Sequence, residues 1–217
     1  MSPWLALVIS FAYVFLVLAI GEGLRRRLGY SSDFTRKFIH VGVGMFSLLA
    51  VFIFERREWA IIPPTAFILI NLLDWRFGLL QAMTSSDRSN LGTVYFPISF
   101  AVIIWFLWDH PGLLVGSLMP LTWGDAMAAV IGRRLGRHHY TVLGSTRSLE
   151  GSLALLVCAA LPTSLALALF GVTNWLPVAC VVAVGATVAE ALSPWGTDNL
   201  TIPAVSAALL AWLAVGG

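Results

Sequence analysis

Two basic side chains and an imidazole recur at helical spacing near the start of one apolar segment. Arg36, His40 and Gly44 follow each other every four residues and share a helix face, with Lys37 beside them. At a membrane boundary this face could hold a phosphate group, while the alternative for the two cations is an interfacial anchor with a snorkelling lysine. An imidazole one turn inside an apolar helix needs a partner, so His40 is the stronger indication of chemistry.

An acidic residue lies deep inside another apolar segment. Asp125 precedes Arg133 by eight residues, which on a helix corresponds to about 12 Å. An acid at such a depth is by default a hypothesis of function, and small residues on its face leave room for a ligand or a neighbouring helix. The alternative is structural: Pro120 breaks the helix, and Thr122 and Asp125 form a capping box at the start of its second half.

A polar loop with glycine, GSTRSLEGS at 144–152, leads into a further apolar segment. Backbone N–H groups at a helix start, together with Arg147, make a candidate anion cradle. Glu150 could bind Mg²⁺, whose octahedral shell commonly combines one or two carboxylates with phosphate oxygens and water. The alternative is that Ser148 is the N-cap and Glu150 is a first-turn acid that complements the helix dipole.

Oxygen ligands also occur near the end of the chain. Glu190 interrupts an apolar run, and Asp198 and Asn199 follow in the next connection. Glu190 is the better functional candidate, because turn formation and helix capping explain Asn199 at least as well.

Two weaker signals remain. The sequence GTVYFP at 92–97 opens an apolar segment and is a candidate wall of a lipid entrance, although an interfacial tyrosine is an equally normal membrane anchor. His138 and His139 are adjacent, do not share a helix face and have no evident third ligand, so a solvated loop is favoured over a metal site.

The composition defines the elements that must position these residues. The chain has 217 residues, of which 59% are hydrophobic and 11% charged, with a mean hydropathy of +0.87. These values are typical of proteins whose solvent is the bilayer. We therefore predict an all-α, polytopic transmembrane bundle that forms a single domain over residues 1–217, with about eight spans (seven to nine). The predicted spans are 3–21, 38–54, 59–73, 93–108, 111–133, 149–171, 174–192 and 200–216.

Two of these spans need comment. The segment 59–73 is short and contains Pro63 and Pro64, and the count drops if it is re-entrant. The apolar run at 4–20 has no basic residue before it and no convincing cleavage site, so it is predicted as the first span rather than a signal peptide.

The basic residues predict the orientation. Counted over alternate connections, eleven fall on one side and only Arg56 and Arg57 on the other, and basic connections stay cytoplasmic. Both termini are therefore predicted to be non-cytoplasmic, and the polar residues above gather at the cytoplasmic face. The eleven are Arg25, Arg26, Arg27, Arg36, Lys37, Arg76, Arg88, Arg133, Arg134, Arg137 and Arg147, and the acids predicted on the same side are Asp33, Asp74, Asp87, Asp125, Glu150, Glu190 and Asp198.

Several classes of function are disfavoured. A net charge of +2 is too small for a nucleic-acid surface. There is no GxxxxGK[ST] and no kinase glycine-rich loop, so any nucleotide must bind at a membrane-specific site. Cys158 and Cys180 lie in apolar stretches and are expected to be packing residues.

With these residues in place, the chain resembles the family of phytol kinases, dolichol kinases and diacylglycerol or polyprenol kinases, which are membrane enzymes similar to CTP transferases. The resemblance covers about residues 35–205. Its five ordered motifs are RKFIHVGVG at 36–44, GTVYFP at 92–97, GDAMAAVIGRRLG at 124–136, TRSLEGS at 146–152 and TDNLTIP at 197–203. Arg147 stands where the family pattern has lysine, and His138 and His139 replace a more usual basic pair; arginine keeps the charge of lysine but binds phosphate with a different geometry.

The resemblance implies transfer of the terminal phosphoryl group of a nucleoside triphosphate, with CTP favoured over ATP, to an isoprenoid alcohol or diacylglycerol. We further expect Mg²⁺ on the donor phosphates, a lipid alcohol from the bilayer and a nucleotide from the cytoplasm, and a homodimer is compatible with these expectations. The untagged N-terminus and the compact length favour a prokaryotic cytoplasmic membrane. The expected catalytic residues are Asp125, Lys37, His40 and Glu150; those binding the nucleotide are Arg36, Arg133, Arg134, Arg147, Ser148, Gly124 and Asn199; the metal ligands are Asp125, Glu150, Asp198 and Glu190. The alternatives are a cytidylyltransferase that forms a CDP-lipid, and a membrane transporter or anion channel.

Overall fold

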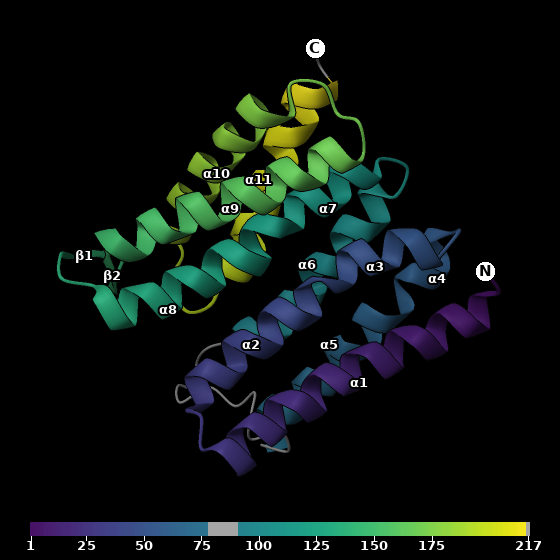
Figure 1. The fold of residues 1–217 in the computed structure, drawn as a ribbon, viewed down its shortest axis with the longest axis horizontal. Helices are drawn as coiled ribbons and strands as arrows, with labels where there is room; N and C mark the ends of the chain where they lie inside the picture. Colours follow the sequence, from purple (N-terminus) through teal and green to yellow (C-terminus); the bar gives the residue numbers. More distant parts are fainter. Residues whose placement is uncertain (78–90, 216–217) are drawn as a thin grey trace.

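The fold is a bundle of helices with one small β-hairpin at its edge (Figure 1). The computed structural model describes residues 1–77 and 91–215. The predictions for Asp87, Arg88 and residue 216 therefore lie outside the described residues. The helices are α1 (Pro3–Leu28), α2 (Ser32–Gly44), α3 (Phe46–Ile53), α4 (Arg57–Ala60), α5 (Ile62–Phe77), α6 (Gly92–Leu107), α7 (Pro111–Met119), the π-helical turn η1 (Pro120–Asp125), α8 (Ala126–Leu135), α9 (Leu149–Leu169), α10 (Trp175–Ala191) and α11 (Asp198–Val215), and the strands are β1 (His139–Val142) and β2 (Ser145–Ser148).

The predicted apolar segments are helical, and the chain is a membrane protein. Within the described residues, five helical stretches are long and apolar enough to cross a bilayer, and three further apolar helices are shorter. The five are 3–28, 32–53, 57–77, 111–135 and 149–169, and the three are 92–107, 175–191 and 198–213. The segment with Pro63 and Pro64 is among the five, because both prolines lie in the first turn of α5, where no backbone N–H is needed.

The prediction of an all-helical chain was wrong at residues 139–148. β1 and β2 pair antiparallel, with His139 opposite Ser148, and a tight turn joins them. Leu143 and Gly144 in that turn both have positive φ, of 49° and 79°, as a two-residue hairpin turn requires. The hairpin escaped prediction because each strand has only four residues and lies in a connection with little apolar alternation.

The helix that carries Asp125 is continuous, as the predicted span 111–133 requires, and the alternative of a broken helix with a capping box does not hold. α7, η1 and α8 follow one another without interruption from Pro111 to Leu135. The Thr122 hydroxyl donates to the Leu118 carbonyl, at 2.8 Å, instead of capping a new helix. Pro120, which lacks a backbone N–H, is accommodated by a π-helical turn at this point.

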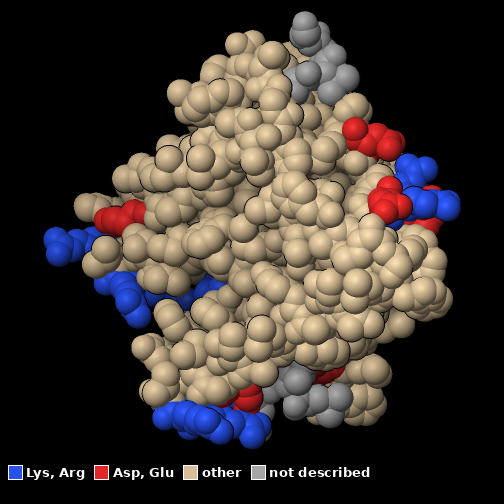
Figure 2. Space-filling model, turned by 45° about the vertical axis from the view of Figure 1, so that its right-hand side comes forward, with Lys and Arg blue, Asp and Glu red and all other residues tan. Residues whose placement is uncertain are grey.

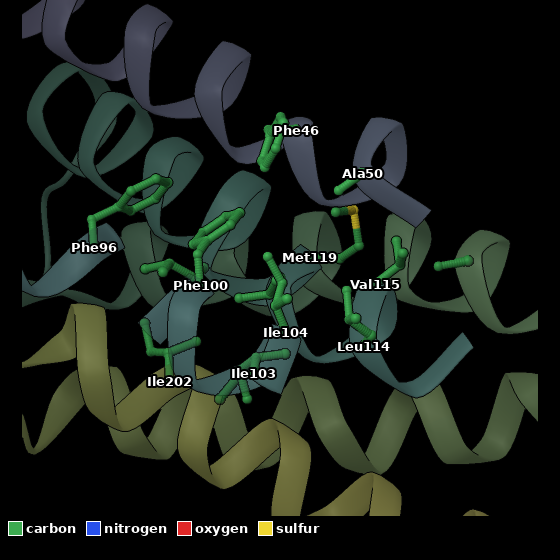
Figure 3. Packing of buried hydrophobic residues seen from close by; sticks show 14 of the residues in the cluster. Phe46, Ala50, Phe96, Phe100, Ile103, Ile104, Leu114, Val115, Met119 and Ile202 are labelled. Carbon is green, nitrogen blue, oxygen red and sulfur yellow. The ribbon is translucent and has the colours of Figure 1, made fainter. Parts of the chain in front are cut away.

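Helix α6 lies at the centre of the core. Phe100 and Ile104 on this helix are almost fully buried, and Figure 3 shows them between Phe46 on α3 and Ile202 on α11. Helix α6 also packs against α5 and α7. In Figure 1 it lies between α1 to α5 on one side and α9 to α11 on the other. It therefore fixes the distance between the two halves of the bundle.

Charged side chains gather at the ends of the bundle. Figure 2 shows them in groups at the left and bottom edges and in another group on the right, with a broad band free of charge between them. The β-hairpin lies at the opposite end of the molecule from the N-terminus (Figure 1). A wide uncharged band is the surface that a bilayer would cover.

Close approach of α2 to η1 yields the first prediction. A Cβ atom on Gly44 would lie 2.5 Å from the Thr122 side chain. Gly44→Ala should therefore force the two elements apart and lower the free energy of unfolding by about 1 to 3 kcal/mol, read as a lower melting temperature in detergent. Gly23→Ala in α1, where a Cβ would meet nothing within 4 Å, is the control and should not lower stability. Equal melting of both variants would contradict the close approach.

Candidate active site

A single cavity of about 770 Å³ brings together residues from both halves of the bundle. Its walls come from α1, α2, α3, α5, α6, η1, α8, the β-hairpin, α9, α10, the loop before α11 and the start of α11. Most of the residues singled out in the sequence line it. These are Arg36, Lys37, His40, Asp125, Arg133, Arg147, Ser148, Glu190, Asp198 and Asn199.

The cavity is polar at one end and apolar at the other. We call the polar arm the part lined by Arg36, Lys37, Asp125, Arg133, His139, Thr146, Arg147, Ser148, Ser152, Glu190, Asp198 and Asn199. The apolar arm is the part lined by Val14, Leu18, Val43, Phe46, Pro63, Pro64, Phe67, Phe96, Pro97 and Phe100. The site is therefore amphipathic.

Three helices produce this division in the same way. On α2 the lining residues change from Lys37 to Val43 along the helix, and on α5 they change from Asn71 to Phe67. α6 carries Thr93 at its polar end, where the Asn71 side-chain amide donates to the Thr93 carbonyl at 2.7 Å. Polar ends of neighbouring helices therefore lie at the same level of the bundle.

A buried ion pair lies in the polar arm. Lys37 Nζ is 2.6 Å from Asp125 Oδ2, and the two side chains are only 13% and 9% exposed. Each charge loses most of its water, so each depends on the other for compensation. The pair ties α2 to η1 across 88 residues of sequence.

His40 completes this group. Its Nε2 is 2.8 Å from the Leu121 carbonyl oxygen of η1 and 3.6 Å from Asp125 Oδ2. Because a carbonyl oxygen only accepts, Nε2 must carry the hydrogen, which leaves the lone pair of the neutral ring on Nδ1. The expectation that this imidazole needs a partner is confirmed. Its ring also contacts Phe96, at 4.6 Å between centroids, so it lies at the junction of the two arms.

Arg147 acts as a clamp between the hairpin and the end of α10. Its Nη2 donates to the carbonyls of Glu190, at 3.1 Å, and Ser193, at 2.7 Å. Its Nε lies 2.8 Å from the Glu190 carboxylate, an ionic contact whose angle is too poor for a hydrogen bond. A lysine ammonium lacks this planar fork and could not bind the two carbonyls and the carboxylate in the same way. The structure therefore explains why arginine occupies this position.

The structure does not bring Glu150 into the cavity. Its carboxylate accepts hydrogen bonds from the backbone N–H of Arg137, at 3.1 Å, and of His138, and lies 2.7 Å from His138 Nδ1. Ser148 is the N-cap of α9, with its hydroxyl accepting from the Gly151 N–H. The structure therefore has the alternative that the sequence left open, with Ser148 as the N-cap of α9 and Glu150 as an acid in its first turn.

Two further expected nucleotide ligands also lie outside the cavity walls. A Cβ on Gly124 would lie 3.2 to 3.3 Å from Leu155 and Ala159, so this glycine lets η1 approach α9. Arg134 is exposed and does not line the cavity. Gly124 is therefore explained by its small size. Arg134 points away from the cavity because it follows Arg133 directly, and adjacent residues on a helix do not share a face.

Some lining residues escaped the sequence analysis. Asn71 is a polar residue within an apolar segment, and the argument used for His40 would have found it. His139 was assigned to a solvated loop because it follows His138. The hairpin begins at His139, while His138 lies before it and its ring contacts Glu150, and this difference separates the two imidazoles.

Three carboxylates of the polar arm fit a divalent cation that also binds phosphate. Asp125, Glu190 and Asp198 line the same cavity, although within the described residues no three His, Cys, Asp or Glu side chains are close enough to hold a metal by themselves. Mg²⁺ usually takes only one or two carboxylates and completes its shell with phosphate oxygens and water. The donor set therefore suits an ion that arrives with a nucleotide.

Comparisons with known proteins identify relatives of this chain. The chain is similar to the phytol kinase of Synechocystis sp., with 32% identity over 213 residues, which cover 96% of this chain and 91% of that protein. It is also similar to CTP-dependent diacylglycerol kinase 1 of Schizosaccharomyces pombe, at 28% identity over 82% of this chain and 92% of that protein. A probable chloroplastic phytol kinase of Triticum aestivum is 28% identical over 97% of this chain. No family model and no solved structure matches the chain.

The buried ion pair yields a stability prediction. Lys37→Met and Asp125→Leu should each lower the free energy of unfolding by about 3 to 5 kcal/mol, because the remaining charge is left uncompensated. The double variant Lys37→Met with Asp125→Leu should recover most of this loss. Unfolding by SDS in mixed micelles measures it.

The control is Arg56→Ala, because this residue pairs with Glu58 at 3.2 Å with both side chains well exposed, and stability should change little. Additive losses in the double variant would contradict the mutual compensation.

Proposed function

Since this chain belongs to the family of phytol kinases and CTP-dependent diacylglycerol kinases, we propose that it transfers the terminal phosphoryl group of CTP to the hydroxyl of an isoprenoid alcohol such as phytol. It is an enzyme of the kinase type. The single observation that carries the proposal is the amphipathic cavity, whose polar arm suits a nucleotide triphosphate and whose apolar arm suits a hydrocarbon chain.

The apolar arm supports a single flexible chain as acceptor. Its walls include four phenylalanine side chains, on α3, α5 and α6. Such rings offer apolar contact without donors or acceptors. A lipid alcohol whose tail lies in this arm would hold its hydroxyl at the junction, near His40.

The cations of the polar arm support binding of the donor phosphates. Arg36 and Arg133 both approach the Asp33 carboxylate, at 3.5 and 3.8 Å, which holds them at the edge of the cavity. Lys37 lies deeper, beside Asp125. Phosphoryl transfer depends mainly on positioning and on neutralisation of charge spread over the transferred group, and fixed cations supply both.

The reaction moves one phosphoryl group and one proton. The hydroxyl oxygen of the alcohol attacks the γ-phosphorus of CTP, the bond from that phosphorus to the bridging oxygen breaks, and CDP leaves. The hydroxyl proton passes to Nδ1 of His40, whose Nε2–H remains bonded to the Leu121 carbonyl. Arg147 holds Glu190 and the loop before Asp198 in place during this step.

Mg²⁺ belongs to the same proposal. Asp125 would hold it, together with Asp198 or Glu190, and the ion when bound neutralises charge on the donor phosphates. Lys37 already balances the charge of Asp125, and the ion would add a second positive charge beside this carboxylate. We place the polar arm at the cytoplasmic face of a prokaryotic cytoplasmic membrane, in keeping with the basic residues at that end and the cyanobacterial source of one relative.

The direct test is phosphate transfer by purified protein in lipid–detergent micelles. With γ-labelled CTP or ATP offered together with phytol, farnesol, a polyprenol or diacylglycerol, we expect a labelled isoprenoid phosphate that requires Mg²⁺ and forms better from CTP. Asp125→Ala should abolish the product, and His40→Ala should lower kcat by about 10²- to 10⁴-fold. The acidic control is Asp109→Ala, an exposed residue outside the cavity, which should leave the rate unchanged.

Other products would overturn the proposal in distinct ways. Release of pyrophosphate with a phospholipid acceptor would identify a cytidylyltransferase. Uptake of anions into proteoliposomes without lipid labelling would identify a transporter.

Glu150 gives a separate prediction. Because its carboxylate binds the backbone at Arg137 and His138 and does not line the cavity, Glu150→Gln should keep kcat within about 2-fold of the wild-type value. Its dependence on Mg²⁺ concentration should also be unchanged. A large rise in the Mg²⁺ concentration needed for half-maximal rate would restore Glu150 as a metal ligand.

A further inference from the structure

The mouth of the cavity is formed by one helix end and the β-hairpin. Among the described residues that line the cavity, three are exposed: Arg133, His139 and Thr146. Arg133 lies in the last turn of α8, and the other two lie on β1 and β2. Figure 2 shows basic side chains in a hollow at this end of the molecule. A polar ligand that enters the polar arm at this opening passes these residues.

The two neighbouring histidines have different surroundings. The His138 ring is bonded to Glu150, at 2.7 Å, and does not line the cavity. His139 is the first residue of β1 and its side chain lines the mouth. Its ring has no ion pair or hydrogen bond to another described side chain. His139 is therefore the imidazole that a ligand would meet.

The hairpin holds the backbone of His139 in a fixed place. His139 is paired with Ser148, the N-cap of α9, so its strand position is tied to the start of that helix. The Tyr140 hydroxyl lies 2.6 Å from the Ser152 hydroxyl, and Arg147 clamps the other strand to α10. A side chain on a braced strand gives a preorganised surface for a flat ligand.

The position of the phosphates determines where the base of a nucleotide lies. Cations that suit phosphates lie inside the polar arm, at Lys37 and Arg36, and the deeper end of the cavity is apolar. The base must therefore extend in the other direction, toward the mouth. Among the described lining residues, the other rings, four phenylalanines and His40, are buried or half-buried, and His139 is the exposed one.

We propose that the base of the nucleotide stacks on the imidazole of His139, which makes the hairpin the base-binding element of the site. This inference rests on the proposed function, since it takes the donor to be a nucleoside triphosphate. Stacking does not distinguish one base from another, because every base has a π face. His139 would therefore strengthen nucleotide binding in general, while the choice of base is made elsewhere.

The test compares CTP with inorganic tripolyphosphate, which has the phosphates but no base. The dissociation constant of labelled CTP is measured by equilibrium dialysis in micelles, and that of tripolyphosphate by competition. His139→Leu, which keeps bulk but has no π face, should weaken CTP by at least about 5-fold. Tripolyphosphate binding should stay within about 2-fold. His139→Phe should keep most of the CTP affinity, and His138→Gln is the matched control.

Each other outcome counts against the inference. An equal loss for CTP and tripolyphosphate in His139→Leu would mean that the ring acts on the phosphates. Unchanged CTP binding would place the base elsewhere, for instance near the exposed Trp195, which adjoins the lining residue Gly196. An equal loss in His138→Gln would mean that the hairpin itself was disturbed.

Failure of the proposed function has a different signature. Wild-type protein that does not bind CTP, and that labels no lipid, overturns both proposals. Wild-type protein that labels a lipid alcohol while His139→Leu binds CTP normally overturns this inference alone.

Discussion

The ion pair between Lys37 and Asp125 is the interaction on which the arrangement of the site depends. Two charges that are each about nine-tenths buried are tolerated only because each one compensates the other. The pair joins α2 to η1, and the bond from His40 to the Leu121 carbonyl reinforces the same junction. Close approach at Gly44 makes this geometry possible, since a larger residue would separate the two elements. Polar chemistry and tight packing are thus parts of one contact.

The amphipathic character of the cavity comes from the directions of the helices around it. α2, α5 and α6 each present polar residues at one level of the bundle and apolar residues at the next. α6 lies in the core between the two halves, so its Phe96 and Phe100 line the apolar arm while also packing internally. A cavity of this kind lets a lipid remain in an apolar environment while its head group meets a charged nucleotide. The membrane location and the reaction are therefore connected by the same three helices.

Cavity-lining residues could be located from the sequence where a charge interrupts an apolar helix. They could not be located where a short polar segment forms a hairpin. Asp125, Lys37 and His40 were found because burial of such groups is costly and needs a reason. The role of Glu150 could not be decided from the sequence, because a first-turn acid at a helix start and a metal ligand look alike there. The hairpin and the position of His139 were missed because their structure depends on pairing of two four-residue strands, and no periodicity in the sequence is long enough to reveal it.

The π-helical turn at Pro120–Asp125 affects how the helix would respond to the loss of a residue. A π turn is equivalent to one extra residue inserted into an α-helix, and each residue turns the helix by about 100°. A chain that had lost one residue here would form a more regular helix. The side chains after the turn would keep nearly the same direction, because the wide turn already absorbs the extra residue. What the chain would lose is the widened segment itself, in which the Leu121 carbonyl and the Asp125 carboxylate both meet α2.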